Sequence, residues 1–451
     1  MNIVIMGCGK VGCELAATLV NEGNNVSVID WQQSALDAVS EEMDVLTVCG
    51  DGADIQVLKE AGIDDAEVFI AVSPDDEVNL MACLVAKQVT EVETIARVRK
   101  PVYFRQGKFL QEKMGVSGII NPEKQAAEDI ATLLTYPAFA RADTFADGNV
   151  IVFTLHARGK YGFAGRSLME IRKESRSKIL ACAVYRKGSV FIPDGSFVLQ
   201  KDDEITFITT PSELPLFLGE HNIRCEPAED ILITGGGTLS YYLAEQLLAE
   251  GKHVRVIERN KERCEFLSEA FPDAEIILGD GTDRRFLIKQ GLMNADAFVA
   301  LTGIDEENIV TANYAKDYAR NKVITKVNRT DLRDVIESLD IDSAVFPKVI
   351  CADVIAQYVR AKKSGAGKNL EVFLRYMGSR VEITEFKVRE EDPGTGVTLR
   401  ELDTKKDLIV ACVLHDGKFS IPSGNSTIQP GDSVVIVTKH KGIASLKDIL
   451  A

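Results

Sequence analysis

The chain has 451 residues, of which 45% are hydrophobic and 27% charged, the balance of a folded globular protein rather than a disordered one. Its formal net charge of −16 argues against a general binder of the nucleic-acid backbone, because such proteins carry a basic excess. No apolar run approaches the roughly 18–20 residues that cross a bilayer. No cationic segment precedes the apolar residues 3–5, so we do not expect the chain to be exported.

The nine cysteines and five histidines are dispersed along the chain. The cysteines form no C-x-x-C pair, so their pattern favours a reducing compartment, the cytoplasm. The histidines show no H-x-x-H or H-E-x-x-H spacing, so the sequence predicts no metal site.

The first 135 residues alternate short β-branched runs with helical patterns, which is typical of a parallel sheet with crossover helices. We expect its strands over residues 2–6, 26–30, 45–48, 68–72 and 94–98. The first helix should end at Gly23, because glycine favours helix termination. From about residue 140 the pattern changes to short strands with little helix, over residues 150–155, 189–192 and 204–208.

The same pattern then begins again, because the chain is an internal duplication. Gly7 and Gly235 open equivalent glycine motifs that lie 228 residues apart, and Asp30 and Glu258 end the next apolar run with the same spacing. Further matching residues follow in the same order along both halves of the chain. One glycine motif alone is weak evidence, whereas a collinear series identifies a tandem repeat.

The duplication predicts an α/β protein with two Rossmann-like doubly wound parallel-sheet domains, each followed by a small α+β lobe. In the second small lobe we expect strands over residues 381–386, 419–421 and 433–437. We place the four domains at residues 1–138, 139–222, 229–364 and 369–451, with linkers over residues 221–229 and 362–368.

Each glycine motif has the chemistry of a dinucleotide-binding turn. The first glycine permits the turn from strand to helix, the second (Gly9 or Gly237) lets a pyrophosphate approach the backbone, and the third allows close packing. Repeat two has Ser240 at the third position. Asp30 and Glu258 stand where an acid accepts hydrogen bonds from ribose hydroxyls, which favours NAD or ATP-type ligands over NADP.

Further repeated residues end the later strands on the same sheet edge, where an adenine would lie. They are Asp51, Ser73 and Arg97 in repeat one, and Asp280, Thr302 and Lys326 in repeat two. Lys10 either reaches a phosphate or stays solvated. A tight turn without a ligand is the alternative for a lone glycine motif, but the repeated set favours nucleotide binding.

The sequence shows no catalytic constellation. His156 and His415 do not occupy matching positions, and we find no Ser-His-Asp, paired-carboxylate or P-loop arrangement. We therefore predict that the chain is not an enzyme. An NAD-dependent oxidoreductase remains the alternative, and a nucleotide sensor unattached to any channel is a third possibility.

These motifs, repeated with the small lobes between them, resemble the tandem TrkA-N/TrkA-C (RCK or KTN) family over essentially the whole chain. The resemblance implies a regulatory subunit on the cytoplasmic face of the membrane, forming a ring that is a homotetramer. It implies binding of NAD(H), ATP or ADP, and gating of potassium flux through a membrane-embedded TrkH/TrkG-like subunit.

Carried over by position, the resemblance assigns two nucleotide sites. The first comprises Gly7, Cys8, Gly9, Lys10, Val11, Gly12, Asp30, Asp51, Gly52, Ser73 and Arg97. The second comprises Gly235, Gly236, Gly237, Thr238, Leu239, Ser240, Glu258, Asp280, Gly281, Thr302 and Lys326. The replacements in repeat two leave its nucleotide preference open.

Two segments with apolar residues at helical spacing, 122–134 and 347–359, follow the last predicted strand of each large domain. They could form the core of their own domain. The family resemblance implies instead that they cross to a partner lobe, and we expect an interface.

Overall fold

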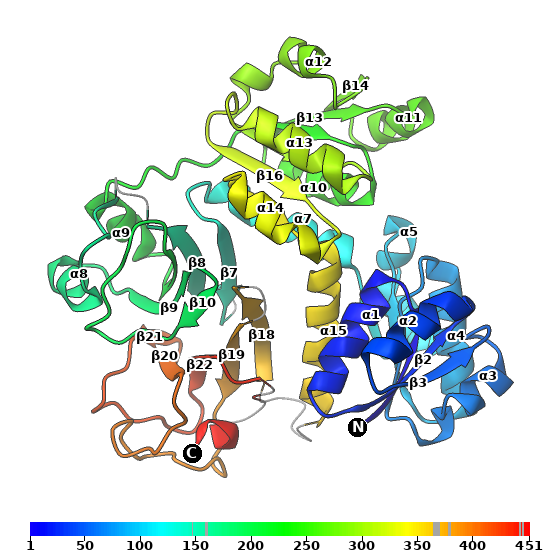
Figure 1. Ribbon diagram of the computed structural model, residues 1–451, viewed down its shortest axis with the longest axis horizontal. Coiled ribbons are helices and arrows are strands. Elements are labelled where there is room, and N and C mark those ends of the chain that lie inside the picture. Colours follow the sequence, from blue (N-terminus) through cyan, green and yellow to red (C-terminus); the bar gives the residue numbers. More distant parts are fainter. Residues whose placement is uncertain (147, 158–160, 364–369, 378–379, 442, 444–445) are drawn as a thin grey trace.

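The computed structural model describes residues 1–146, 148–157, 161–363, 370–377, 380–441, 443 and 446–451. Within them the chain forms four sheets that alternate large, small, large, small along the sequence (Figure 1). The predicted α/β class, with two doubly wound parallel sheets, is confirmed.

The first large sheet is parallel, with the strand order β3-β2-β1-β4-β5-β6. Its strands are β1 (Asn2–Met6), β2 (Asn25–Asp30), β3 (Leu46–Cys49), β4 (Val68–Ala71), β5 (Glu93–Arg97) and β6 (Gly118–Ile120). Its connecting helices are α1 (Lys10–Asn21), α2 (Gln33–Glu42), α3 (Ile55–Glu60), α4 (Asp76–Val89), α5 (Pro101–Phe104) and α6 (Gly107–Met114). The five predicted strands are confirmed, and β6 is an additional one.

The second large sheet repeats this topology in the order β14-β13-β12-β15-β16-β17. Its strands are β12 (Asp230–Thr234), β13 (His253–Glu258), β14 (Glu275–Leu278), β15 (Ala297–Ala300), β16 (Lys322–Lys326) and β17 (Ser343–Val345). Its helices are α10 (Thr238–Ala249), α11 (Lys261–Ala270), α12 (Arg284–Lys289), α13 (Asp305–Ala315) and α14 (Arg333–Ser338). Gly23 and Gly251, with φ of +74° and +77°, follow α1 and α10. Both are helix ends of the kind that glycine permits.

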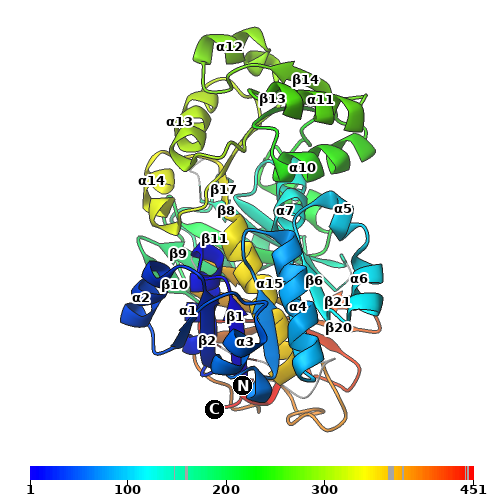
Figure 2. The same ribbon diagram turned by 90° about the vertical axis from the view of Figure 1, so that its right-hand side faces the viewer.

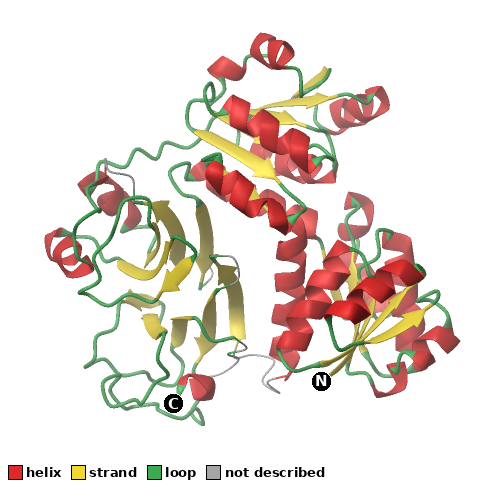
Figure 3. Ribbon diagram, in the orientation of Figure 1, coloured by secondary structure: helices red, strands yellow, loops and turns green. Residues whose placement is uncertain are grey.

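The two small sheets are antiparallel, and the lobes that contain them consist mainly of strands and loops (Figure 3). The first contains β7 (Arg141–Phe145), β8 (Val150–His156), β9 (Leu180–Arg186), β10 (Ser189–Phe191) and β11 (Glu204–Thr209), with helices α8 (Leu168–Glu174) and α9 (Leu214–Glu220). The second contains β18 (Leu370–Tyr376), β19 (Val381–Lys387), β20 (Leu408–His415), β21 (Lys418–Ser420) and β22 (Ser433–Thr438). Val152 and Ile208 of the first share one apolar core with Ile383 and Val437 of the second. The small lobes therefore pack against each other.

The last helix of each large domain covers the sheet of the other repeat. Helix α7 (Pro122–Thr135) packs on α10, and Ile130 is fully buried in the core of the second large sheet. Helix α15 (Pro347–Lys363) packs on α1, and Ile355 is fully buried in the core of the first (Figures 1 and 2). The expected interface is present, and it lies within one chain.

The residues at equivalent positions at the start of β5 and β16 form hydrogen bonds to α15 and to the segment after α7, respectively. The Glu93 carboxylate accepts hydrogen bonds from the Tyr358 hydroxyl (3.2 Å) and the Lys362 ammonium (2.9 Å) on α15. Lys322, only 2% exposed, donates to the carbonyl oxygens of Pro137 (3.2 Å) and Phe139 (2.6 Å) just beyond α7. Opposite charges therefore serve the same purpose in the two halves.

The predicted linker over residues 362–368 is wrong at its start, because α15 continues through Lys363. The remainder, residues 364–368, lies outside the described residues. The predicted linker over residues 221–229 connects α9 to β12 without helix or strand.

The exchange of helices predicts where damage to α15 will appear. We expect Ile355→Ala to lower the free energy of unfolding by about 2–5 kcal/mol, because it leaves a cavity under the first large sheet. Hydrogen exchange should then accelerate in β1 and β2, which lie more than 300 residues away in sequence. Val310→Ala is the control, since Val310 is 68% exposed on α13. Loss of protection confined to the second large sheet would contradict this prediction.

Candidate functional site

Each glycine motif forms a tight turn between the first strand of a large sheet and the helix that follows. Gly7 has a φ of +105°, and a Cβ there would lie 2.9 Å from the Ser73 amide nitrogen. Gly235 has a φ of +92°, and a Cβ there would lie 2.8 Å from the Leu301 carbonyl carbon. Both the backbone conformation and the close approach therefore require glycine.

The second glycine of each motif leaves the helix N-terminus open. Gly9 and Gly237 are the N-caps of α1 and α10, and neither helix has a side-chain cap. A Cβ built on either glycine would meet nothing within 4 Å. The first N–H groups of each helix therefore have no side-chain partner, and such a helix N-terminus stabilises an anionic group.

The third position differs between the repeats, as the sequence indicates. A Cβ on Gly12 would lie 1.8 Å from the Gly7 carbonyl oxygen, so only glycine fits there. At the equivalent place the Ser240 hydroxyl donates a hydrogen bond to the Gly235 carbonyl oxygen. Val11 and Leu239, which follow the turns, are buried in the cores and pack rather than face a ligand.

The two acids at the ends of β2 and β13 are held in place by backbone amides. Asp30 accepts hydrogen bonds from the amides of Cys8 (2.6 Å) and Gln32 (2.9 Å). Glu258 accepts from the amides of Gly236 (2.6 Å) and Asn260 (2.7 Å). Each carboxylate therefore stands beside its glycine turn, at the place predicted for a ribose-binding acid.

An arginine that sequence analysis missed distinguishes the second turn. Arg263 on α11 donates from Nε to the Gly236 carbonyl oxygen (2.5 Å), and its guanidinium lies over the Phe266 ring. Burial lowers the pKa of Arg263, although the neighbouring Glu258 charge opposes that shift. Repeat one has Ala35 at the equivalent position. The ribose edge therefore carries an extra cation only in repeat two.

Two buried asparagines organise the strand ends that face the glycine turns. The Asn79 amide bonds to the backbone of Ser73 (2.8 and 3.0 Å) and to the Arg97 carbonyl oxygen (3.0 Å). Asn308 makes the same three bonds to Thr302 and Lys326. Their repetition at a spacing of 229 was visible in the sequence, but their clamping role was not.

The G-D-G segments close turns next to the first strand of each sheet. Asp51 accepts from the amide of Ala53 (2.9 Å), and Asp280 accepts from the amide (2.9 Å) and hydroxyl (2.7 Å) of Thr282. A Cβ on Gly52 would collide with Met6, and one on Gly281 would lie 2.9 Å from Thr234 Cβ. These glycines therefore let the third strand's turn pack against the first strand.

The basic residues at the ends of β5 and β16 have different environments. The Arg97 guanidinium forms an ion pair with Glu123 on α7 (3.1 Å). The Lys326 ammonium donates to the Leu301 carbonyl oxygen (3.2 Å), and burial lowers its pKa. The structure therefore brings the predicted residues of each repeat to one sheet edge, with unlike charges around them.

Family models for the TrkA-N domain match residues 3–122 and 231–347, and models for the TrkA-C domain match residues 157–219 and 383–451. The chain belongs to the TrkA-N/TrkA-C family. It is 30% identical over 98% of its length to the Trk system potassium uptake protein TrkA of Halomonas elongata, covering 96% of that protein. It is 29% identical, over the full length of both chains, to a TrkA homolog of Archaeoglobus fulgidus.

Solved structures share the fold of this TrkA-N/TrkA-C chain. The GsuK channel bound to NAD superposes with a TM-score of 0.64 at 18% identity, over 98% of this chain and 77% of that one. The GsuK RCK domain gives the same TM-score and identity, over 98% of this chain and 93% of the other. In the described part of the chain no helix is long and apolar enough to span a membrane.

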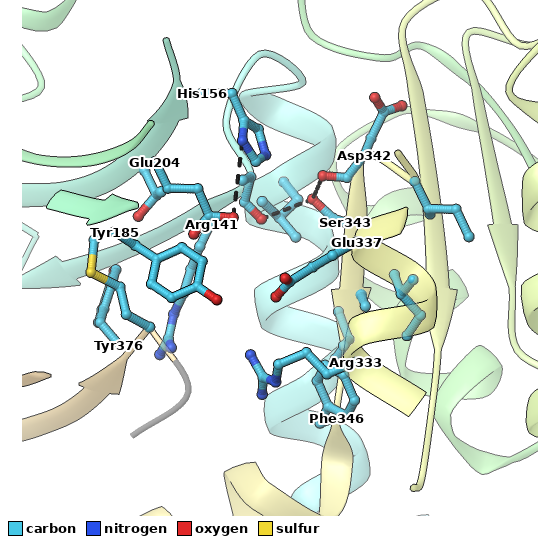
Figure 4. Close-up of a pocket in the computed structure, with 18 of the residues that line it drawn as sticks. Arg141, His156, Tyr185, Glu204, Arg333, Glu337, Asp342, Ser343, Phe346 and Tyr376 are labelled. Carbon is cyan, nitrogen blue, oxygen red and sulfur yellow. Dashed lines mark hydrogen bonds and ion pairs between the residues drawn. The ribbon is translucent and has the colours of Figure 1, made fainter. Parts of the chain in front are cut away.

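This TrkA-N/TrkA-C chain also contains a cavity of about 960 Å³ between the first small sheet and the end of the second large domain (Figure 4). Glu204, Tyr185 and His156 line one wall, and Arg333 and Glu337 on α14 line the other. Burial and the facing Glu337 carboxylate raise the pKa of Glu204 to about 7. Burial likewise raises the pKa of Asp129, which also lines the cavity, to about 7.

The raised pKa of Glu204 predicts that the contact between the first small sheet and α14 weakens as pH rises. Glu204 ionises near pH 4.5 when unfolded and near pH 7 when folded, so stability falls between these values and stays low above them. We expect Glu204→Gln to raise the free energy of unfolding at pH 8 by on the order of 2 kcal/mol. At pH 5 it should have little effect.

Chemical denaturation at both pH values, with hydrogen exchange in β11 and α14, would measure this. Glu60→Gln on the surface of α3 is the matched control. An equal effect of Glu204→Gln at pH 5 and pH 8 would rule out titration of this carboxyl.

Proposed function

We propose that this chain is the cytoplasmic regulatory subunit of a Trk-type potassium uptake system, and that nucleotides bound at its two glycine turns gate potassium flux. The observation that carries this proposal is the pairing, in both repeats, of an uncapped helix N-terminus with an amide-held ribose acid. The Trk-system names of full-length relatives support the assignment. NAD(H), ATP and ADP are the proposed ligands.

Gating requires a ligand that binds two conformations with different free energies. Helix α1 offers a path for this, because its N-terminus forms the first glycine turn. Just past its other end, Glu22 pairs with Arg360 on α15 (2.6 Å), and Arg360 also pairs with Glu382 on β19 (3.1 Å). All three side chains are nearly buried. A ligand that displaces α1 therefore acts on α15 and on the second small sheet together.

The proposed partner is a membrane-embedded potassium-translocating subunit of the TrkH/TrkG type, and the proposed assembly is a homotetrameric ring. This chain would then be associated peripherally with the inner face of the cell membrane. Co-purification with a potassium transporter of many transmembrane segments would support this proposal. The proposal would be refuted if the chain binds nucleotides but binds no such subunit.

The alternative is an NAD-dependent oxidoreductase, which needs a general acid or base beside the nicotinamide. His156 and His415 lie on β8 and β20 of the small sheets rather than at the glycine turns. In the described parts of the chain no cluster of three or more His, Cys, Asp or Glu residues could hold a metal ion. Sustained nicotinamide turnover with hydroxy-acid or aldehyde substrates would overturn the regulatory proposal.

The ribose acids provide a direct test of nucleotide binding. We expect calorimetry on the purified chain to detect two nucleotide sites, and Asp30→Ala to weaken the first by about 1.5–3 kcal/mol, because charged hydrogen bonds to ribose are lost. Asp30→Asn should lose less, since it retains one oxygen for the loop amides. Asp64→Ala, at an exposed position, is the control. Unchanged affinity in Asp30→Ala would refute this site.

A further inference from the structure

Two free cysteines meet at the first glycine turn. Cys8 lies between the first two glycines of the motif, and Cys13 lies in the first turn of α1. Their sulfur atoms are 3.8 Å apart, which is close to van der Waals contact. The backbone holds them together, because the Cys13 amide donates to the Gly9 carbonyl oxygen (2.9 Å) and the Cys13 thiol donates to the Cys8 carbonyl oxygen (3.3 Å).

The second glycine turn has no such pair. At the same offset of 228 residues, Gly236 and Tyr241 occupy the positions of Cys8 and Cys13. A Cβ on Gly236 would lie 2.8 Å from the Leu267 side chain, so a side chain does not fit there. Tyr241 is buried in the core of the second large sheet. The contact between two thiols is therefore a feature of the first half alone.

The two thiols differ in access and in acidity. Cys8 is 4% exposed and its thiol donates to the Ala35 carbonyl oxygen (3.5 Å), whereas Cys13 is half-buried. The hydrogen bond from Cys8 lowers the pKa of Cys13, while burial and the charges of Glu42 and Asp30 oppose that shift. The same hydrogen bond, and then burial, raise the pKa of Cys8. The first turn of a helix also favours a thiolate. Cys13 is therefore the nucleophile of the pair, and Cys8 keeps its proton.

We propose that Cys8 and Cys13 form a redox site, in which hydrogen peroxide closes a reversible disulfide across the first glycine turn and weakens nucleotide binding there. The effect on nucleotides rests on the proposed function, whereas the chemistry of the two thiols does not. The cysteine pattern predicts a reducing compartment, and disulfides that form in such compartments are usually transient and sense oxidants.

The reaction has two steps. The Cys13 thiolate attacks one oxygen of hydrogen peroxide, the O–O bond breaks, and hydroxide leaves, so that Cys13 becomes a sulfenic acid. The Cys8 sulfur then attacks the Cys13 sulfur, an S–S bond forms, and the hydroxyl group leaves as water with the Cys8 proton. The hydroxide takes the proton that Cys13 released on ionising. The two thiols lose two electrons in total, and the peroxide gains them and becomes two water molecules. A dithiol reverses the reaction by exchange.

Closing the disulfide changes the turn that would hold a pyrophosphate. A disulfide keeps its sulfur atoms about 2.05 Å apart, so the two must approach by roughly 2 Å from their present separation. The start of α1 has no room to move toward the turn, because a Cβ on Gly12 would lie 1.8 Å from the Gly7 carbonyl oxygen. The Cys8 segment must therefore adjust. Its amide holds the Asp30 carboxylate (2.6 Å), so this adjustment disturbs the ribose acid as well.

Peptide mapping of the full chain tests the disulfide itself. Trypsin cleaves after Lys10, between the two cysteines, so a disulfide joins two peptides that otherwise separate. After treatment of the reduced chain with hydrogen peroxide, we expect mass spectrometry to detect the joined peptides, and dithiothreitol to separate them. Cys13→Ser should abolish the link. Cys49→Ser, at an exposed thiol after Asp30 on the neighbouring strand, is the matched control and should keep the link. Oxidation of Cys49 with no link between Cys8 and Cys13 would overturn the proposal.

Calorimetric titration with ADP, before and after oxidation, tests the effect on the first turn. We expect its affinity to fall about tenfold to a hundredfold, because a charged hydrogen bond at the ribose acid is disturbed, and the affinity of the second turn to stay unchanged. Dithiothreitol should restore the first site. Cys13→Ser should bind ADP equally before and after peroxide, since serine keeps a donor to the Cys8 carbonyl oxygen, whereas Cys49→Ser should still lose affinity. Equal losses at both turns, or a loss that persists in Cys13→Ser, would overturn the proposal.

Reciprocity supplies a readout that a purely structural cysteine pair would not move. If the disulfide weakens ADP binding, saturating ADP must favour the dithiol by the same factor. A tenfold weakening corresponds to a rise of about 30 mV in the reduction potential of the pair. Titration in glutathione buffers, with and without ADP, measures this shift. A potential that ADP leaves unchanged would overturn the coupling.

The two proposals fail in different ways. If the reduced chain binds no nucleotide, the proposed function fails, and the effect of the disulfide on nucleotides fails with it. If the reduced chain binds ADP but peroxide never joins Cys8 to Cys13, or joins them without changing the affinity of the first turn, only the redox site fails.

Discussion

Neither large sheet is covered by helices of its own repeat alone, and this mutual dependence constrains the whole molecule. The first sheet buries one apolar face under α1, α2 and α15, and the second buries the matching face under α10, α11 and α7. Removing either crossing helix would expose a continuous apolar surface. The two halves therefore depend on each other for folding, and each glycine turn begins a helix that packs against a helix supplied by the other repeat.

The backbone around the two turns is nearly duplicated, but its charges are not. Asn79 and Asn308 make the same three hydrogen bonds, and Asp30 and Glu258 accept from equivalent amides. Around this common frame, Ala35 is replaced by Arg263. The duplication thus preserves the groups that shape the turn. Substitution beside the turn gives the two halves different local charges.

The sequence predicted the turns well because their requirements are local. A positive φ at Gly7 and an amide-held carboxylate at Asp30 follow from a short motif. Which sheet α15 covers could not be derived in that way. Residues such as Ile355 define an apolar stripe, yet a stripe does not specify which sheet it covers. Arg263 was missed because its role depends on a neighbour from a distant segment, the Gly236 carbonyl oxygen.

The buried ion pairs between α1, α15 and β19 bear on how motion passes through the exchanged helices. Arg360 is 3% exposed and holds both Glu22 and Glu382, while Arg375 adds contacts to Glu22 and Asp353. Separating one partner would leave a charge buried without compensation, which costs several kcal/mol. Small continuous displacements at this point are therefore resisted. A packed cluster of buried ion pairs therefore favours discrete rearrangement over gradual displacement.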